Sequence, residues 1–277
     1  MLDLTSFSGA TRIYYVVGDP IAQVKSPAGV TGLLRERGVE GICVPAHVAP
    51  ADLAAWVAAT TSMRNCDGII VTVPHKFSAL ALCASATPRA VSIGAVNVMR
   101  RDASGGWFGD MCDGDGYVAG LRKAGCEPKG RRALLVGAGG AGSAIAHALV
   151  DAGVASLALH EADVRRREDL ARKLRAYGAL QPEVGSADPS GFDLVINATP
   201  MGMKPTDPLP ILVDRLSAAT TFVGDVVTVP EVPPLIEAAR AKGCGTMTGK
   251  GMFEAVRDRM VDFLDPGAAL APCTSSV

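Results

Sequence analysis

The stretch Ala133-Leu-Leu-Val-Gly-Ala-Gly-Gly-Ala-Gly142 decides the fold prediction, because an apolar strand runs directly into closely spaced glycines. The apolar residues 143–150 follow at once and are typical of a buried helix. In such a unit the first glycine permits a tight turn, the second lets the backbone approach a pyrophosphate, and the third allows close helix packing. The helix N-terminus adds N–H groups and the positive end of a dipole. We therefore predict a dinucleotide site; a plain glycine turn and an adenosyl-methionine site are the alternatives.

The choice of cofactor depends on Glu161, which ends the next expected strand, residues 156–160. A carboxylate there can accept hydrogen bonds from the adenine ribose and would repel the additional phosphate of NADP. Two like charges about 4 Å apart at an effective dielectric constant of about 20 repel by about 4 kcal/mol. We therefore predict that NAD is preferred, with NADP as the second candidate. Residues 165–167 are arginines that could hold a phosphate, but we favour solvated positions in the first turn of a helix.

Composition limits the class of protein. The chain has 277 residues, of which 48% are hydrophobic and 20% charged, which is enough for two cores. A formal net charge of -1 offers no attraction for nucleic acid or an anionic membrane. The first ten residues lack a basic segment followed by an apolar one, and no run of about 20 residues could span a bilayer. We expect a cytoplasmic monomer or homodimer that acts on a small molecule.

Cysteines and histidines give no sign of a metal site. The seven cysteines stand at positions 43, 66, 83, 112, 126, 244 and 273, without CxxC spacing. An odd number without that spacing favours reduced, mostly buried thiols over disulfides or zinc. The four histidines are scattered, and none pairs with another ligand at metal-binding spacing.

Apolar strands and amphipathic helices alternate along the whole chain, which is the signature of an α/β protein. Strands are expected near 13–17, 41–47, 68–73, 94–100, 106–109, 133–136, 156–160, 181–184, 193–198, 221–227 and 245–247. Helices are expected near 27–37, 51–63, 74–86, 115–124, 141–152, 164–177, 232–242 and 251–264. The strands 94–100 and 106–109 should form a hairpin, and residues 265–277 a loose tail. More than 100 residues precede the glycines, so we predict a substrate domain there and an active site between the two domains.

Seven segments resemble the shikimate dehydrogenase family in their order and spacing. They are Gly18-Asp-Pro-Ile-Ala-Gln-Val-Lys-Ser-Pro27, Val71-Thr-Val-Pro-His-Lys76, Gly94-Ala-Val-Asn97, Asp113-Gly-Asp-Gly116, Gly137-Ala-Gly-Gly-Ala-Gly142, Asn197-Ala-Thr-Pro-Met-Gly-Met203 and Gly249-Lys-Gly-Met252. The resemblance implies a substrate domain of residues 1–113 and 249–277 and a Rossmann-type NAD(P) domain of residues 114–248. It also implies that the C-terminal helix returns to the first domain.

The family's reaction moves a hydride between nicotinamide and a ring alcohol, and the resemblance gives the two catalytic roles to Lys76 and Asp113. A partly desolvated lysine can accept the alcohol proton and return it to the ketone. The aspartate can orient the lysine or bind a neighbouring hydroxyl. Without the resemblance, Lys76 would be a surface charge in a first helical turn and Asp113 a helix N-cap.

The resemblance also assigns binding residues. Ser26, Thr72 and Asn97 should position substrate, and Ser26 before Pro27 should also be a helix N-cap. The expected cofactor contacts are Gly137, Gly139, Gly140, Ala141, Gly142, Glu161, Ala198, Thr199, Pro200, Met203, Val226, Gly249 and Met252.

Departures from the family pattern concern the substrate. Polar residues of the family are replaced here by Val24, Ile70, Met111-Cys112, Thr228 and Val256, and we expect Val24, Thr228 and Val256 to line the substrate site. Three lost contacts at about 1–2 kcal/mol each would cost shikimate about 3–6 kcal/mol, unless loops or water replace them. We predict a dehydrogenase acting on shikimate, quinate or a related cyclic hydroxy acid. A nonenzymatic NAD-binding sensor with an eroded substrate site is the alternative.

Overall fold

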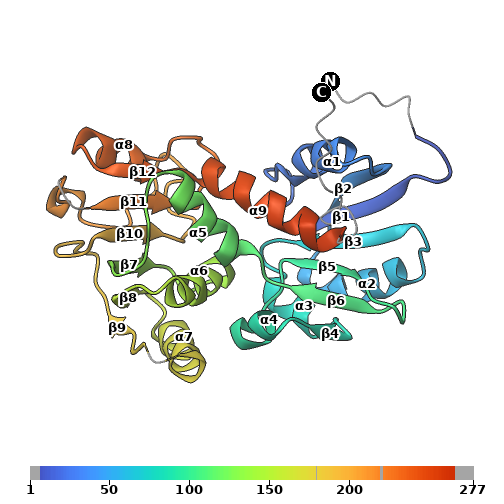
Figure 1. The fold of residues 1–277 in the computed structure, drawn as a ribbon, viewed down its shortest axis with the longest axis horizontal. Coiled ribbons are helices and arrows are strands. Elements are labelled where there is room, and N and C mark those ends of the chain that lie inside the picture. Colours follow the sequence, from blue (N-terminus) through green and yellow to red (C-terminus); the bar gives the residue numbers. More distant parts are fainter. Residues whose placement is uncertain (1–6, 179, 219–220, 266–277) are drawn as a thin grey trace, which may run out of the picture. The chain divides into compact units, whose positions relative to one another are not determined.

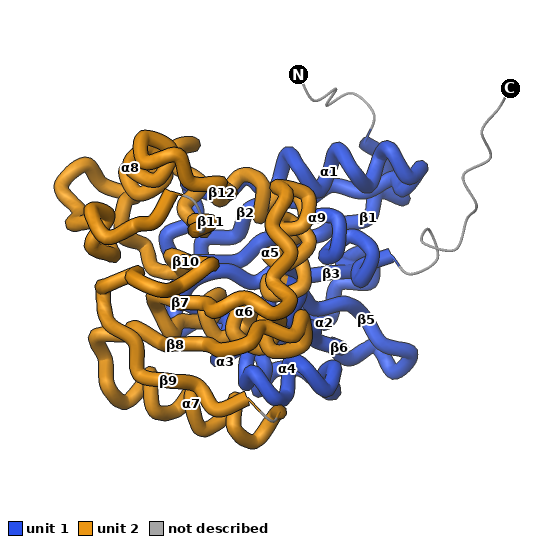
Figure 2. Tube along the Cα trace, turned by 60° about the vertical axis from the view of Figure 1, so that its left-hand side comes forward, with its two compact units in different colours: residues 1–112, 257–277 blue, residues 113–256 orange. Residues whose placement is uncertain are grey.

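The computed structural model describes residues 7–178, 180–218 and 221–265 (Figure 1). The chain divides into two compact units (Figure 2). Unit 1 contains the residues up to Cys112 and those from Arg257 onward, and unit 2 contains residues 113–256. The predicted tail lies outside the described residues beyond Asp265, as does Cys273.

Unit 1 is built on a mixed sheet in the order β2-β1-β3-β5-β6-β4. The strands are β1 (Arg12–Gly18), β2 (Gly41–His47), β3 (Cys66–Val71), β4 (Ser85–Ala86), β5 (Val98–Arg101) and β6 (Trp107–Asp110). Its helices are α1 (Ser26–Glu36), α2 (Leu53–Thr61), α3 (Lys76–Leu80) and α4 (Pro88–Ile93), with a 3₁₀ turn η2 (Pro50–Asp52) before α2. β5 and β6 pair antiparallel, which confirms the predicted hairpin.

Unit 2 has a fully parallel sheet in the order β12-β11-β10-β7-β8-β9. The strands are β7 (Arg132–Val136), β8 (Ser156–His160), β9 (Glu183–Val184), β10 (Leu194–Asn197), β11 (Phe222–Asp225) and β12 (Gly245–Met247). The helices are α5 (Asp113–Lys123), α6 (Gly140–Asp151), α7 (Val164–Tyr177), α8 (Pro234–Ala241) and the first half of α9 (Gly249–Leu264), and η3 (Val213–Arg215) is a 3₁₀ turn. Counted within the unit, this is the 3-2-1-4-5-6 order of the Rossmann fold, which confirms the fold prediction.

Helix α9 carries the chain from unit 2 back to unit 1, where the division lies at Arg257 rather than at the expected residue 249. Within unit 2, a Cβ added to Gly116 of α5 would lie 2.4 Å from Cγ2 of Val256, so the two helices are closely packed. Within unit 1, a Cβ on Gly68 of β3 would lie 2.3 Å from Leu264. Phe263 also stacks on Phe108 with ring centroids 5.6 Å apart, so the end of α9 covers the sheet of unit 1.

The predicted helix 74–86 was wrong beyond Leu80, because the chain joins the sheet there. α3 ends at Leu80, and the N–H groups of Ala84 and Thr87 donate to carbonyl oxygens of β6. Sheet pairing therefore overrides the helical preference of this alanine-rich segment. The prediction also missed α4, whose N-cap Thr87 accepts from Ala90 N and precedes a proline. The strand expected from residue 94 begins only at Val98.

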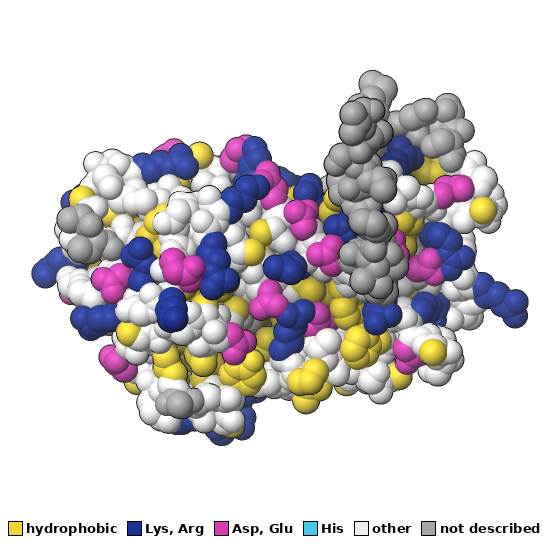
Figure 3. All heavy atoms as spheres, in the orientation of Figure 1, with side chains coloured by type: hydrophobic (Ala, Val, Ile, Leu, Met, Phe, Trp, Pro, Cys, Tyr) yellow, Lys and Arg dark blue, Asp and Glu magenta, His cyan; other side chains and the backbone are white. Residues whose placement is uncertain are grey.

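No helix within residues 7–178, 180–218 and 221–265 is long and apolar enough to cross a membrane. The same residues contain no group of three or more His, Cys, Asp or Glu side chains placed to hold a metal ion. The six cysteines that the structure describes are free thiols. Acidic and basic side chains are interspersed on the face drawn in Figure 3, in keeping with the balanced charge of the sequence.

Candidate active site

Candidate substrate residues of unit 1 follow strands that run in one direction. β1 and β3 are parallel, and β6 shares their direction because it is antiparallel to β5, which is antiparallel to β3. Their carboxyl ends therefore lie at one edge of the sheet, where α/β proteins place their ligand sites. Thr72 follows β3 directly and Lys76 begins α3 after it, while Asp113 follows β6 by three residues and opens unit 2.

Lys76 is half-buried and is held at the start of α3 by its neighbours. Its carbonyl oxygen accepts from Val96 N at 2.9 Å. The preceding residue, His75, is buried, and its Nε2 donates to the Val48 carbonyl oxygen at 2.8 Å. The bond from Val96 connects the backbone of Lys76 to the residue directly before Asn97.

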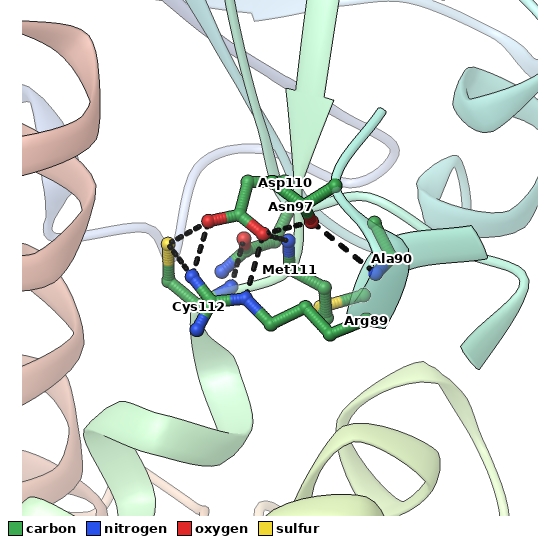
Figure 4. Close-up of polar contacts among 7 residues, drawn as sticks. Arg89, Ala90, Asn97, Asp110, Met111 and Cys112 are labelled. Carbon is green, nitrogen blue, oxygen red and sulfur yellow. Dashed lines mark hydrogen bonds and ion pairs between the residues drawn. The ribbon is translucent and has the colours of Figure 1, made fainter. Parts of the chain in front are cut away.

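Asn97 is buried and is held by hydrogen bonds of its backbone and of its side chain, and Figure 4 shows it close to Asp110 and Cys112. Its N–H donates to the Asp110 carbonyl oxygen at 2.9 Å, and its own carbonyl accepts from Val71 N at 2.7 Å. Its side-chain Oδ1 accepts from Cys112 N at 2.8 Å. This last bond engages Oδ1 and defines the orientation of the amide.

Asp110, which the sequence prediction missed, anchors the end of β6. The residue is 2% exposed, and its carboxylate accepts from Thr87 Oγ1 at 2.5 Å, Arg89 Nε at 2.7 Å and Met111 N at 2.8 Å. Arg89 also pairs with it through Nη2, so the contact is bidentate. Burial raises the pKa of Asp110, but the hydrogen bonds from Arg89 and Thr87 outweigh burial and hold the pKa below its usual value.

The glycine loop between β7 and α6 fits a dinucleotide pyrophosphate. Gly137 has φ +102°, and a Cβ on Gly142 would lie 2.1 Å from the Gly137 carbonyl oxygen. The protein's own packing therefore requires both of these glycines. Gly139 differs, because a Cβ there would meet no atom within 4 Å. Open space beside this backbone, at the N-terminus of α6, is what a bound pyrophosphate needs.

Glu161 lies at the end of β8, against this loop. Its Oε2 accepts from Ala138 N at 2.8 Å and its Oε1 from Asp163 N at 3.0 Å. Asp163 caps α7, accepting from Arg165 N at 2.9 Å. Arg166 in turn lies 3.6 Å from the Asp163 carboxylate. The Glu161 carboxylate therefore contacts the loop, and the arginines belong to the first turn of α7, as expected.

The candidate cofactor loop after β10 is folded around Asn197. Its Oδ1 accepts from Thr199 N at 3.0 Å and from Thr199 Oγ1 at 2.6 Å. Its Nδ2 donates to the Met201 carbonyl at 3.1 Å and to both carboxylate oxygens of Asp225, each at 3.2 Å. Asp225 also accepts from Val227 N at 2.8 Å and thus joins this loop to the segment after β11.

Asp225 is fully buried, and burial raises its pKa to about 6 although hydrogen bonds oppose the change. The hydroxyl of Tyr117 on α5 also faces this strand end, since a Cβ on Gly224 would lie 2.0 Å from it. An unfolded aspartate titrates near 3.8. The folded state therefore binds the Asp225 proton more tightly, and its stability falls as pH rises from about 4 to about 6.

We expect Asp225→Asn to remove this pH dependence. Two pKa units correspond to about 3 kcal/mol. Between pH 4 and pH 6 the unfolding free energy of the wild type should therefore fall by about this amount relative to that of the variant. Above that range the difference should stay constant. Urea unfolding of both proteins at several pH values measures it, and parallel curves across pH 4–6 would contradict the assignment.

The remaining candidate residues lie in separate places. Ser26 is the first residue of α1, and the N-cap position expected for it belongs to Lys25, which makes no side-chain capping bond. Val24 is half-buried in the turn before α1, and Thr228 is half-buried after β11. A Cβ on Gly249 would lie 2.2 Å from the Val227 carbonyl, so the start of α9, which carries Met252, packs next to Val226 and Val227. Val256, expected in the substrate site, packs against Gly116.

A Rossmann-type sheet with a glycine loop at a helix N-terminus, in one chain with an α/β unit bearing a lysine at its sheet edge, is the architecture expected of an NAD(P)-dependent oxidoreductase. Residues 16–99 match the shikimate dehydrogenase substrate binding domain. The chain is 39% identical over 248 residues to a shikimate dehydrogenase (NADP(+)) of Acidiphilium cryptum, covering 89% of this chain and 87% of that protein. The chain belongs to the shikimate dehydrogenase family, which confirms the resemblance and the predicted enzyme class.

Solved structures agree with this conclusion. A quinate dehydrogenase from Corynebacterium glutamicum in complex with NAD is 27% identical, with a TM-score of 0.84 over 92% of this chain and 94% of that one. The ligand-free 5-ketofructose reductase of Gluconobacter sp. strain CHM43 is 28% identical, with a TM-score of 0.81 over 92% of each chain. The comparisons give no support to the nonenzymatic sensor.

Proposed function

We propose that the chain transfers a hydride between a nicotinamide dinucleotide, NAD in preference, and the ring alcohol or ketone of shikimate, quinate or a related cyclic hydroxy acid. The observation that carries this proposal is the linkage at the sheet edge of unit 1. Backbone hydrogen bonds connect Lys76 to Val96, Asn97 to Asp110, and Cys112 to the Asn97 side chain, directly before Asp113. Lys76 and Asn97, two of the groups expected to touch the ring alcohol, thus share one hydrogen-bonded support in unit 1.

Each residue has a defined task in this reaction. The Lys76 amine accepts the proton of the ring alcohol during oxidation and returns it to the ketone during reduction. The Asp113 carboxylate accepts a hydrogen bond from the amine or from a neighbouring hydroxyl, and Asn97 Nδ2 donates to a ring oxygen. Ser26 and the N–H groups at the start of α1 suit a substrate carboxylate. A dinucleotide whose pyrophosphate lies along Gly137–Gly142 would supply hydride acceptor and donor chemistry through its nicotinamide ring.

The preference for NAD rests on Glu161. Its carboxylate is adjacent to the glycine loop, where the adenine ribose of a dinucleotide would lie. The Acidiphilium relative carries NADP(+) in its name, whereas the Corynebacterium quinate dehydrogenase was solved with NAD. The negative charge of Glu161 favours NAD, the cofactor in the quinate dehydrogenase structure.

Glu161→Gln tests the preference. The amide removes the repulsion of a 2′-phosphate, so we expect the ratio of kcat/KM for NAD to that for NADP to fall at least about tenfold. Glu168→Gln, which removes an exposed carboxylate of α7, is the control and should leave the ratio unchanged. Equal ratios in the wild type and the Glu161 variant would contradict the role of this carboxylate.

A second substrate class is favoured by the lost polar groups. Val24 and Thr228 stand where family members carry residues for the substrate carboxylate, and the 5-ketofructose reductase is a structural neighbour named for a substrate without that group. A neutral polyol ketone is therefore the second candidate. Initial rates with shikimate, quinate and 5-ketofructose, using both cofactors, separate the classes. Turnover of none of them would overturn the proposal. We also place the enzyme in the cytoplasm, acting on small molecules as a monomer or homodimer.

A further inference from the structure

The Arg89 and Asp110 pair is a heavily bonded polar group of unit 1 that the proposed mechanism does not use. Figure 4 shows Arg89 of α4 reaching the carboxylate at the end of β6, with Asn97 and Cys112 beside it. Arg89 binds both carboxylate oxygens, and its guanidinium also lies 3.9 Å from Cys112 Sγ. The Cys112 thiol itself lies 3.6 Å from Asp110 Oδ2.

We propose that Arg89, acting through Asp110, is a positioning residue for the redox reaction. This inference rests on the proposed function and names a residue that sets the geometry of its substrate groups. The Asp110 carboxylate accepts from Met111 N, which defines the path of the chain after β6. The next N–H, that of Cys112, then reaches Asn97 Oδ1, and the next residue is Asp113.

The consequence is that one ion pair controls two predicted substrate groups. If the carboxylate turns away, the turn at Met111 is released, and the Asn97 amide loses the bond that orients it. A misplacement of about 1 Å at a reacting group can lower a rate about 100-fold. Asp110 and Cys112, which Arg89 contacts, belong to unit 1, whereas the predicted cofactor residues belong to unit 2. The effect should therefore fall on turnover and substrate, with cofactor affinity unchanged.

Unit 1 contains a matched control, the pair of Arg12 and Asp67. Arg12 also binds its carboxylate through two nitrogens, with Nε to Oδ2 at 2.6 Å. This pair lies at the start of β1 and β3, the opposite ends of those strands from the predicted site. The two arginine side chains are similarly exposed, 36% for Arg89 and 39% for Arg12. The carboxylates differ, since the side chain of Asp110 is 3% exposed and that of Asp67 is 28% exposed, so loss of Arg89 should cost more stability. Only loss of Arg89 should disturb the site.

The experiment compares Arg89→Met, Arg89→Lys and Arg12→Met with the wild type, well below their unfolding temperatures. We expect Arg89→Met to lower kcat about 30- to 100-fold, with the dissociation constant of NADH, followed by nicotinamide fluorescence, within about twofold. Arg89→Lys should recover part of kcat, because it restores the charge but not the bidentate contact. Added guanidinium ion should rescue Arg89→Met through the exposed side of the pair. Arg12→Met should keep kcat within about twofold.

Amide hydrogen exchange gives a second measurement that does not need turnover. Exchange in peptides covering Asn97 and residues 110–113 should rise in Arg89→Met and stay at the wild-type level in Arg12→Met. Equal exchange in the two variants, or a loss of kcat in Arg12→Met as large as that in Arg89→Met, would overturn the positioning role. If the wild type turns over none of the substrates, the proposed function fails, and the exchange measurement still decides whether Arg89 orders this segment.

Discussion

Lys76→Ala is expected to lower kcat with the preferred ring alcohol by about 10²- to 10⁴-fold, the range for loss of a positioned acid and base. The physical reason is that an alcohol does not release hydride readily while it retains its proton, and alanine offers no group to accept it. Stopped-flow measurement of NADH formation in a single turnover isolates this step. NADH affinity should stay within about twofold, because the expected cofactor contacts of the glycine loop lie in the other unit.

Two controls make this result specific. Lys129→Ala removes an exposed lysine of unit 2 and should leave kcat unchanged. Small primary amines such as methylamine should partly restore turnover to Lys76→Ala, with a rate that rises with pH as the free amine forms. Retention of wild-type kcat by the alanine variant would remove Lys76 from the chemistry and leave Asp113 as the remaining candidate for the proton.

The sequence predicted those elements whose hydrophobic period agrees with their final packing. Residues 156–160 form β8 and 164–177 form α7 as expected, because the apolar positions alone define the buried face of each element. The prediction of a helix over 74–86 was wrong because the hydrogen bonds of this segment to β6 join residues more than 20 positions apart in the sequence. Local propensity contains no information about such a partner.

In the candidate site, too, the residues that belong to local motifs were predicted, and those that depend on distant partners were not. Lys76 and Asn97 belong to short motifs whose residue order could be read directly from the chain. Asp110, Arg89 and Asp225 were missed because each acts through a partner brought close only by folding. Their one signal in the sequence is a carboxylate that ends an apolar strand, as Asp110 and Asp225 both do. Buried carboxylates need such partners, so a charged residue at that position could have prompted a search for a cation or an amide.

The largest expected effect on stability comes from Gly142→Ala. The added Cβ would lie 2.1 Å from the Gly137 carbonyl oxygen. This oxygen belongs to the backbone of the glycine loop between β7 and α6, so it cannot rotate away as a side chain could. Relief requires α6 to move off the loop, at a cost of about 3 kcal/mol or more, the upper part of the range for overpacking. Urea unfolding should show this loss, and NADH binding should disappear with it because the loop no longer meets the helix N-terminus.

Gly139→Ala separates the two requirements for glycine in this loop. Gly139 has φ −73° and ψ −170°, which alanine adopts without strain, and its Cβ would meet no protein atom within 4 Å. Stability should therefore be unchanged or rise by up to about 1 kcal/mol, since alanine restricts the unfolded chain. NADH affinity should nevertheless fall at least about tenfold, because the methyl group occupies the space into which a pyrophosphate must approach. Unchanged affinity in a stable Gly139→Ala protein would mean that the dinucleotide does not cross this loop, and it would remove the central support for cofactor binding in unit 2.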